Sequence, residues 1–173
     1  MTIASSSSNL PLNRRVGWQI WLILALITVA SVGGYLITSA ITYRIGFPLD
    51  DAWIHQTYAR NLALRGEWAF TPGKSSGGST SPLWSALLAV GFWLKLAPYA
   101  WTYLLGAAAL WGISGLGEKT VRSLIPLYSP RFPWVGAAIA LEWHLVWAAA
   151  SGMETLLYAL LVTAVLVLSL IHI

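Results

Sequence analysis

The stretch GFPLDDAWIHQTYARNLALRGEWAFTPGKSSGGSTSPLW, residues 46–84, decides the fold because it is a polar insert between long apolar runs. It holds three of the six acidic residues of the chain, Asp50, Asp51 and Glu67, together with His55. A chain of this pattern keeps its apolar runs in lipid and its polar insert in water. We therefore expect most of the chemistry of the protein to lie in this insert.

The composition of the 173-residue chain indicates a membrane protein. Hydrophobic residues make up 57% and charged residues 9%, with a mean hydropathy of +0.68, whereas soluble domains carry about 25% charged residues. Eleven tryptophans and seven tyrosines suit the aromatic belts of membrane interfaces. The net charge of +4 is small and scattered, which excludes the clustered basic face of a nucleic-acid-binding protein. The absence of cysteine excludes disulfides and thiolate metal sites.

The apolar run before the insert is expected to cross the membrane. Residues 1–15 are serine-rich and polar, which predicts a disordered cytoplasmic tail. Arg14 and Arg15 then precede about 25 apolar residues, so we expect a span over residues 17–41. A cleavable signal peptide is the alternative, but its apolar core has only about 7–15 residues. The arginine pair favours a cytoplasmic start of the span, which places the insert outside.

The sequence after the insert predicts three further spans, over residues 99–116, 134–150 and 155–171. The apolar run at residues 83–97 makes only roughly 22 Å of helix, which is short of a hydrocarbon core of about 30 Å. We therefore expect a juxtamembrane helix there, inside an outer loop of residues 42–98; a true crossing would reverse the sides of all later segments. The expected fold is all-α, a multi-pass transmembrane helical protein whose extracytoplasmic loop carries short juxtamembrane helices.

Local signals predict two helices in this outer loop. Asp50 precedes a helical pattern that ends at Gly66, with Trp53 among its apolar positions. Ser81 followed by Pro82 predicts the start of the next helix, with the serine hydroxyl as its cap. Residues 118–133, between two expected spans, are predicted to form a polar connection.

Asp50 and Asp51 are the sharpest candidates for chemistry. Two adjacent carboxylates repel each other, which favours proton uptake by one of them, as a general base requires. The alternative is structural, because acidic residues at a helix N-terminus cap free N–H groups and offset the helix dipole. His55 lies one helical turn after Asp51, which permits an Asp–His pair or a metal site. A lone surface histidine is the simpler interpretation.

Cations and a second acidic site complete the set of candidates. Arg60 and Lys74 could bind a phosphate or contact lipid headgroups. Glu154 ends the sequence Ser-Gly-Met-Glu that begins at Ser151. This spacing is typical of a capping box, in which each of the two side chains bonds the backbone N–H of the other residue.

Four short segments carry a resemblance to a known family. They are Asp50-Asp51-Ala52, Tyr58-Ala59-Arg60-Asn61-Leu62-Ala63, Phe70-Thr71-Pro72-Gly73 with Thr80-Ser81-Pro82-Leu83-Trp84, and Ser151-Gly152-Met153-Glu154-Thr155. In this order they resemble the GT-C superfamily of multi-spanning glycosyltransferases, especially its bacterial arabinofuranosyl- and mannosyltransferase-like members. The likeness covers about residues 17–165. Relatives often carry an acidic-glycine-aromatic triplet before Thr-Ser-Pro, where this chain has Gly77-Gly78-Ser79.

The resemblance implies a glycosyltransferase of the cell (plasma or inner) membrane. Such an enzyme moves a sugar from a polyprenyl-phosphate donor to a hydroxyl of a cell-envelope glycan, lipid or protein on the outer face. Asp50 and Asp51 would supply the catalytic base and would be the ligands of a divalent cation if one takes part. The residues that would bind substrate or phosphate are Arg60, Lys74, His55, Tyr58 and Glu154.

The chain stops at Leu170-Ile171-His172-Ile173, at the edge of an apolar run. Because relatives in the superfamily have many more spans, we expect residues 16–173 to be the N-terminal part of a larger transmembrane domain and to be inactive alone. The other class of function that fits the sequence is a non-catalytic membrane subunit or fragment, whose outer loop binds lipid headgroups or a partner.

Overall fold

A computed structural model describes residues 17–125 and 127–172; the expected tail over residues 1–15 lies outside them. Helices are the regular secondary structure of the described residues, with one isolated backbone bridge between Thr71 and Lys74, which confirms the all-α class. Its seven helices are α1 (Trp18–Thr42), α2 (Asp51–Arg65), α3 (Pro82–Trp93), α4 (Pro98–Leu124), α5 (Trp134–Leu141), α6 (Trp143–Ala150) and α7 (Thr155–His172).

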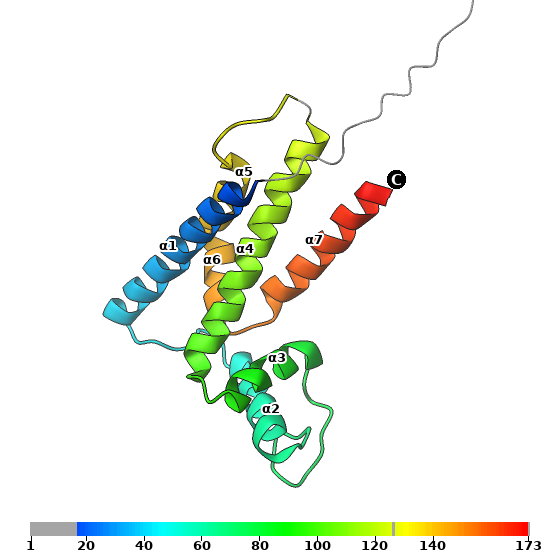
Figure 1. Cartoon of the computed structure of the whole chain (residues 1–173). Coiled ribbons are helices and arrows are strands. Elements are labelled where there is room, and N and C mark those ends of the chain that lie inside the picture. Colours follow the sequence, from blue (N-terminus) through cyan, green and yellow to red (C-terminus); the bar gives the residue numbers. More distant parts are fainter. Residues whose placement is uncertain (1–16, 126, 173) are drawn as a thin grey trace, which may run out of the picture.

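The helices form a bundle with a cap at one end (Figure 1). In the bundle, α4 contacts α1, α5, α6 and α7. In the cap, α2 and α3 pack against each other, at the end where α1 finishes and α4 begins. The polar insert therefore folds as a layer across one end of the bundle, and α3 lies in this layer.

Apolar and small residues join the helices of the bundle. Val32 of α1, Leu110 of α4 and Leu156 of α7 are buried in one core. Gly106 lets α4 approach α6 closely, because an added Cβ would collide with the carbonyl group of Ala149. Small residues at helix interfaces are typical of helices that associate in lipid, where close packing rather than water exclusion holds them together.

The first helix is long and apolar enough to cross a membrane. Only 17% of its most apolar 18-residue window is buried, so most of its surface presents apolar side chains outward. Among the described residues no other single helix meets the same test, although α6 and α7 meet it together with a bend of 119° between them. Crossing by more than one segment stays a prediction.

The segment over residues 134–150 consists of two helices instead of one, and its crossing of the membrane stays a prediction. Its helix is interrupted at Glu142, where α5 ends and α6 begins. The backbone of Glu142 is extended, with φ −66 and ψ 123, and its carboxylate accepts a hydrogen bond from the N–H of Leu145 at 2.8 Å. The glutamate side chain therefore caps a new helix instead of continuing the old one.

The fourth helix continues to Leu124, well beyond the expected end at residue 116. The charged residue Glu118 lies in this added part of the helix and is fully buried. The Glu118 carboxylate accepts hydrogen bonds from Arg122 Nε at 2.6 Å and from the N–H groups of Val135 and Gly136, both at 3.1 Å. These last two groups open α5, so the carboxylate satisfies free donors of a helix N-terminus. The predicted polar connection at residues 118–133 is thus helical in its first part.

Candidate functional site

The acidic pair lies at the N-terminus of α2, on the boundary between bundle and cap. Asp50 is the N-cap residue, and its Oδ1 accepts a hydrogen bond from the N–H of Asp51 at 3.1 Å. Both side chains are exposed. The Asp51 carboxylate makes no hydrogen bond or ion pair within the described residues. One carboxylate thus has a local backbone partner, while the other is free to meet a substrate.

His55 lies one turn further along α2 and is only 1% exposed. Its Nδ1 lies 3.3 Å from Ser85 Oγ of α3, and its Nε2 lies 3.1 Å from Glu154 Oε2. The interpretation of His55 as a surface histidine was therefore wrong. A hydroxyl beside one ring nitrogen and a carboxylate beside the other fix the orientation of an imidazole and suit it to proton transfer.

A chain of polar groups continues from the histidine toward the loop of the cap. Ser85 Oγ lies 3.1 Å from Ser79 Oγ, and Ser79 is half-buried in the loop before α3. At the other end, neither His55 Nε2 nor Glu154 Oε2 hydrogen-bonds to any other group in the described part of the chain. The sequence gives no local signal for the two serines, because their role depends on the packing of α3 against α2.

Glu154 reaches the histidine from the break between α6 and α7, so the expected capping box is absent. Ser151 Oγ instead donates to the carbonyl oxygen of Ala148 at 2.8 Å and accepts a hydrogen bond from the N–H of Met153 at 3.2 Å. The serine therefore stabilises the turn itself. This leaves the glutamate side chain, which is 26% exposed, for His55.

The break between α6 and α7 also packs directly against the cap. The indole Nε1 of Trp84 donates to the carbonyl oxygen of Gly152 at 2.9 Å. Gly152 has φ +82, and a Cβ added there would lie 2.7 Å from both Ala52 Cβ and Phe47 Cδ1. Both the backbone conformation and the close approach require glycine. Gly152 therefore brings the start of α7 against the start of α2.

Tyr58 and Asn61 hold the loop that follows α2. Tyr58 is 1% exposed; its hydroxyl lies 2.6 Å from Ser76 Oγ and accepts a hydrogen bond from the N–H of Gly78 at 3.0 Å. Asn61 Nδ2 donates to the carbonyl oxygen of Ala69 at 2.8 Å. The tyrosine, which the resemblance suggests as a substrate-binding residue, thus shapes the loop.

The two candidate phosphate ligands lie away from the acidic pair. Arg60 is exposed and sits more than two helical turns after Asp51, about 13 Å along the axis. Lys74 is exposed in a turn whose Gly73 N–H donates to Glu67 Oε2 at 2.8 Å, just beyond the C-terminus of α2. The structure therefore brings together Glu154 and His55, but it does not gather the two cations beside the acidic pair.

A cavity of about 450 Å³ opens beside Glu154, between the start of α3 and α7. Its lining combines the carboxylate with hydroxyl-bearing and apolar side chains. The hydroxyl-bearing residues are Thr80, Ser81, Thr155 and Tyr158, and the apolar residues are Leu83, Leu157 and Leu161. Such a cavity suits a ligand that joins a hydroxylated group to an apolar chain.

Among the described residues, no three His, Asp or Glu side chains lie close enough together to hold a metal ion. A divalent cation bound by Asp50 and Asp51 stays a prediction. Comparisons with protein-family models, curated proteins and solved structures found no match.

Proposed function

We propose that the chain belongs to a membrane glycosyltransferase of the GT-C type, which transfers a sugar from a polyprenyl-phosphate donor to a hydroxyl acceptor on the outer face of the cell membrane. The observation that carries the proposal is that the resembling segments meet at one end of the bundle. Glu154 lies beside His55, the Trp84 indole bonds Gly152, and Tyr58 holds the loop before α3. Segments far apart in sequence thus form one local structure.

The acidic pair supplies the base in the proposed reaction. The carboxylate of Asp51 or Asp50 accepts the proton of the acceptor hydroxyl as its oxygen attacks the anomeric carbon of the donor sugar. The bond between that carbon and the phosphate oxygen breaks, and polyprenyl phosphate leaves with the bonding electrons. A positioned general base accelerates such a step by about 10²–10⁴-fold.

The negative charge of the leaving phosphate needs a partner near the acidic pair. Because Arg60 and Lys74 lie toward the other end of α2, a divalent cation bound by Asp50 and Asp51 is the better candidate. Glu154 faces the adjoining cavity and would accept hydrogen bonds from sugar hydroxyls.

The surface of α1 supports the membrane part of the proposal. Its side chains Leu26, Val29 and Ile37 are each more than half exposed, and exposure of large apolar groups along a helix of this length suits lipid contact. The candidate site begins eight residues beyond Thr42, the last residue of α1 (50 − 42 = 8). This is close enough for a lipid-linked donor to reach it from the bilayer.

The test is sugar transfer in membranes of cells that express Asp50→Asn and Asp51→Asn variants. Asparagine keeps a capping oxygen and removes the base. We expect at least one variant to reach the membrane at normal levels and to lose about 10²–10⁴-fold in turnover from a polyprenyl-phosphate-linked donor. Glu67→Gln, the same acid-to-amide change at the far end of α2, should retain turnover. Near-normal turnover by both aspartate variants would refute the enzymatic proposal.

A second candidate function is a non-catalytic membrane subunit whose cap binds lipid headgroups or a partner protein. The exposed apolar side chains of the cap favour it, since Leu64 is 67% and Trp93 77% exposed. Retained turnover in the aspartate variants, together with loss of membrane or partner association after Trp93→Ser, would select this function.

A further inference from the structure

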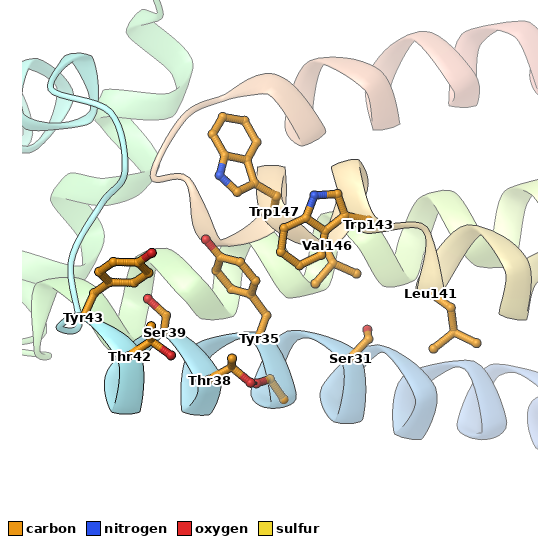
Figure 2. A pocket seen from close by; sticks show the side chains of 11 residues that line it. Ser31, Tyr35, Thr38, Ser39, Thr42, Tyr43, Leu141, Trp143, Val146 and Trp147 are labelled. Carbon is orange, nitrogen blue, oxygen red and sulfur yellow. The ribbon is translucent and has the colours of Figure 1, made fainter.

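A groove of about 490 Å³ runs along α1 on the side that faces α6. Figure 2 shows the Tyr35 ring of α1 projecting across it toward Trp143 and Trp147 of α6. The Tyr35 and Trp143 rings meet edge to face, with centroids 5.5 Å apart. Leu141 and Val146 also line this side, so one wall of the groove is aromatic and aliphatic.

Hydroxyl groups also line the groove, and some of them have no partner within the described residues. Thr38 Oγ1 donates to the carbonyl oxygen of Gly34 at 2.8 Å. The side-chain hydroxyls of Tyr35, Ser39 and Tyr43, by contrast, make no hydrogen bond within the described residues. Tyr35 and Ser39 are four residues apart and so fall on one face of α1, and Tyr43 follows directly after the last residue of this helix. They are available as donors to a ligand in the groove.

A second cavity, of about 610 Å³, continues the groove past the end of α1. Tyr35, Ser39 and Tyr43 line both cavities, so the two cavities adjoin at these residues. Arg44 is the one charged residue among the described residues that line either cavity, and it forms no ion pair in the described part of the chain. The groove thus leads from an apolar slot to an unpaired guanidinium.

We propose that this groove binds one anionic phospholipid of the surrounding bilayer, with its phosphodiester at Arg44 and an acyl chain between α1 and α6. A guanidinium binds phosphate oxygens bidentately, and one cation matches the single negative charge of a phosphodiester. The hydroxyls of Ser39 and Tyr43 add donors at the same end. The groove opens on the side of an apolar helix, where bilayer lipids are the most concentrated molecules. The proposal needs α1 to lie in a membrane, and it is independent of sugar transfer.

Native mass spectrometry of the 173-residue chain, purified in detergent, tests the site with equal amounts of phosphatidylglycerol and phosphatidylcholine. We expect preferential retention of phosphatidylglycerol. Arg44→Gln should weaken that retention about tenfold or more, because it removes the charge-assisted hydrogen bonds to phosphate. Arg65→Gln, which removes the same charge from the end of α2, should behave as the unmodified chain does.

A pair of glycine variants tests the acyl-chain slot. Gly34 lines the groove, and an added Cβ there meets no atom within 4 Å, so Gly34→Leu has room to begin a side chain at the slot. A Cβ added at Gly33 also meets nothing within 4 Å, but Gly33 does not line the groove. The Gly34→Leu variant should no longer retain phosphatidylglycerol, whereas the Gly33→Leu variant should retain it as the unmodified chain does. Circular dichroism should show the same helical content in both.

Three results would overturn the proposal. The first is equal lipid retention by the Arg44 and Arg65 variants, which would mean that the guanidinium of Arg44 binds no headgroup. The second is equal retention by the Gly33 and Gly34 variants, which would mean that the slot is not the site. The third is displacement of phosphatidylglycerol by polyprenyl phosphate at equal concentration, which would make the groove a donor site instead.

Discussion

Glu154 Oε2 lies 3.1 Å from Nε2 of the buried His55, and this contact ties the break between α6 and α7 to the first turns of α2. The histidine is 1% exposed and the glutamate side chain 26%, so the pair has one face in the protein interior and one toward the cavity beside α7. Any ligand in that cavity would meet a carboxylate whose position is set by α2, the helix that also carries Asp50 and Asp51.

The His55–Glu154 contact should contribute measurably to stability. We expect Glu154→Gln to lower the free energy of unfolding by about 1–3 kcal/mol, because the buried imidazole loses its charged partner. In a double-mutant cycle with His55→Gln, the coupling energy should be about 0.5–3 kcal/mol. Thermal unfolding in detergent, followed by circular dichroism, measures both values.

A coupling energy clearly below about 0.5 kcal/mol would mean that His55 and Glu154 do not interact as a pair in the folded protein.

Gly152 should be intolerant of any side chain. We expect Gly152→Ala to lower the free energy of unfolding by about 2–4 kcal/mol, since the new Cβ meets Ala52 and Phe47 and the residue has a positive φ. Gly66 has φ +69, but a Cβ added there meets nothing within 4 Å. Gly66→Ala should therefore lower the free energy of unfolding by only about 1 kcal/mol, from backbone strain alone. Unfolding midpoints that fall equally for the two variants would contradict the close packing at Gly152.

Local sequence signals predicted the ends of the cap helices. Gly66 ends α2 in a left-handed conformation, and Pro82 occupies the first turn of α3, as glycine and proline favour at these positions. The expected Ser81 cap was wrong, because its side chain makes no capping hydrogen bond. Backbone preferences of single residues are thus readable from sequence, whereas the choice of a side-chain partner depends on the rest of the fold.

Apolar spacing predicts only part of the buried face of α2, including Tyr58. Trp53, an expected apolar position, is 48% exposed, whereas His55 and Gln56 are buried. His55 lies beside Ser85, and Gln56 Nε2 donates to Thr102 Oγ1 at 2.7 Å. Side chains on α3 and α4 offer hydrogen-bond partners to these buried polar residues, and hydrophobic periodicity carries no information on such partners. The same limit explains why His55 was expected at the surface.

Glu118 should be one of the most sensitive positions in the bundle. We expect Glu118→Ala to lower the free energy of unfolding by about 3–5 kcal/mol, because it leaves Arg122 without its charged partner and two N–H groups of α5 without an acceptor. Lys119→Ala, at the next position of the same helix, should change the free energy of unfolding by no more than about 0.5 kcal/mol. Chemical unfolding in detergent distinguishes the two. A small effect of Glu118→Ala would show that water reaches this end of the bundle.

The cap should lie on the outer side of the membrane. Ser76 is exposed in the cap, and Ser129 is exposed in the link between α4 and α5, at the opposite end of the bundle (Figure 1). Arg14 and Arg15 precede α1 in the sequence, and basic residues beside a span favour the cytoplasm. In this cysteine-free chain, Ser76→Cys should react with an impermeant maleimide from outside, and Ser129→Cys only after the membrane is permeabilised. The reversed pattern would place Asp50 and Asp51 in the cytoplasm and contradict transfer on the outer face. Labelling of both from outside would mean that α4 does not cross.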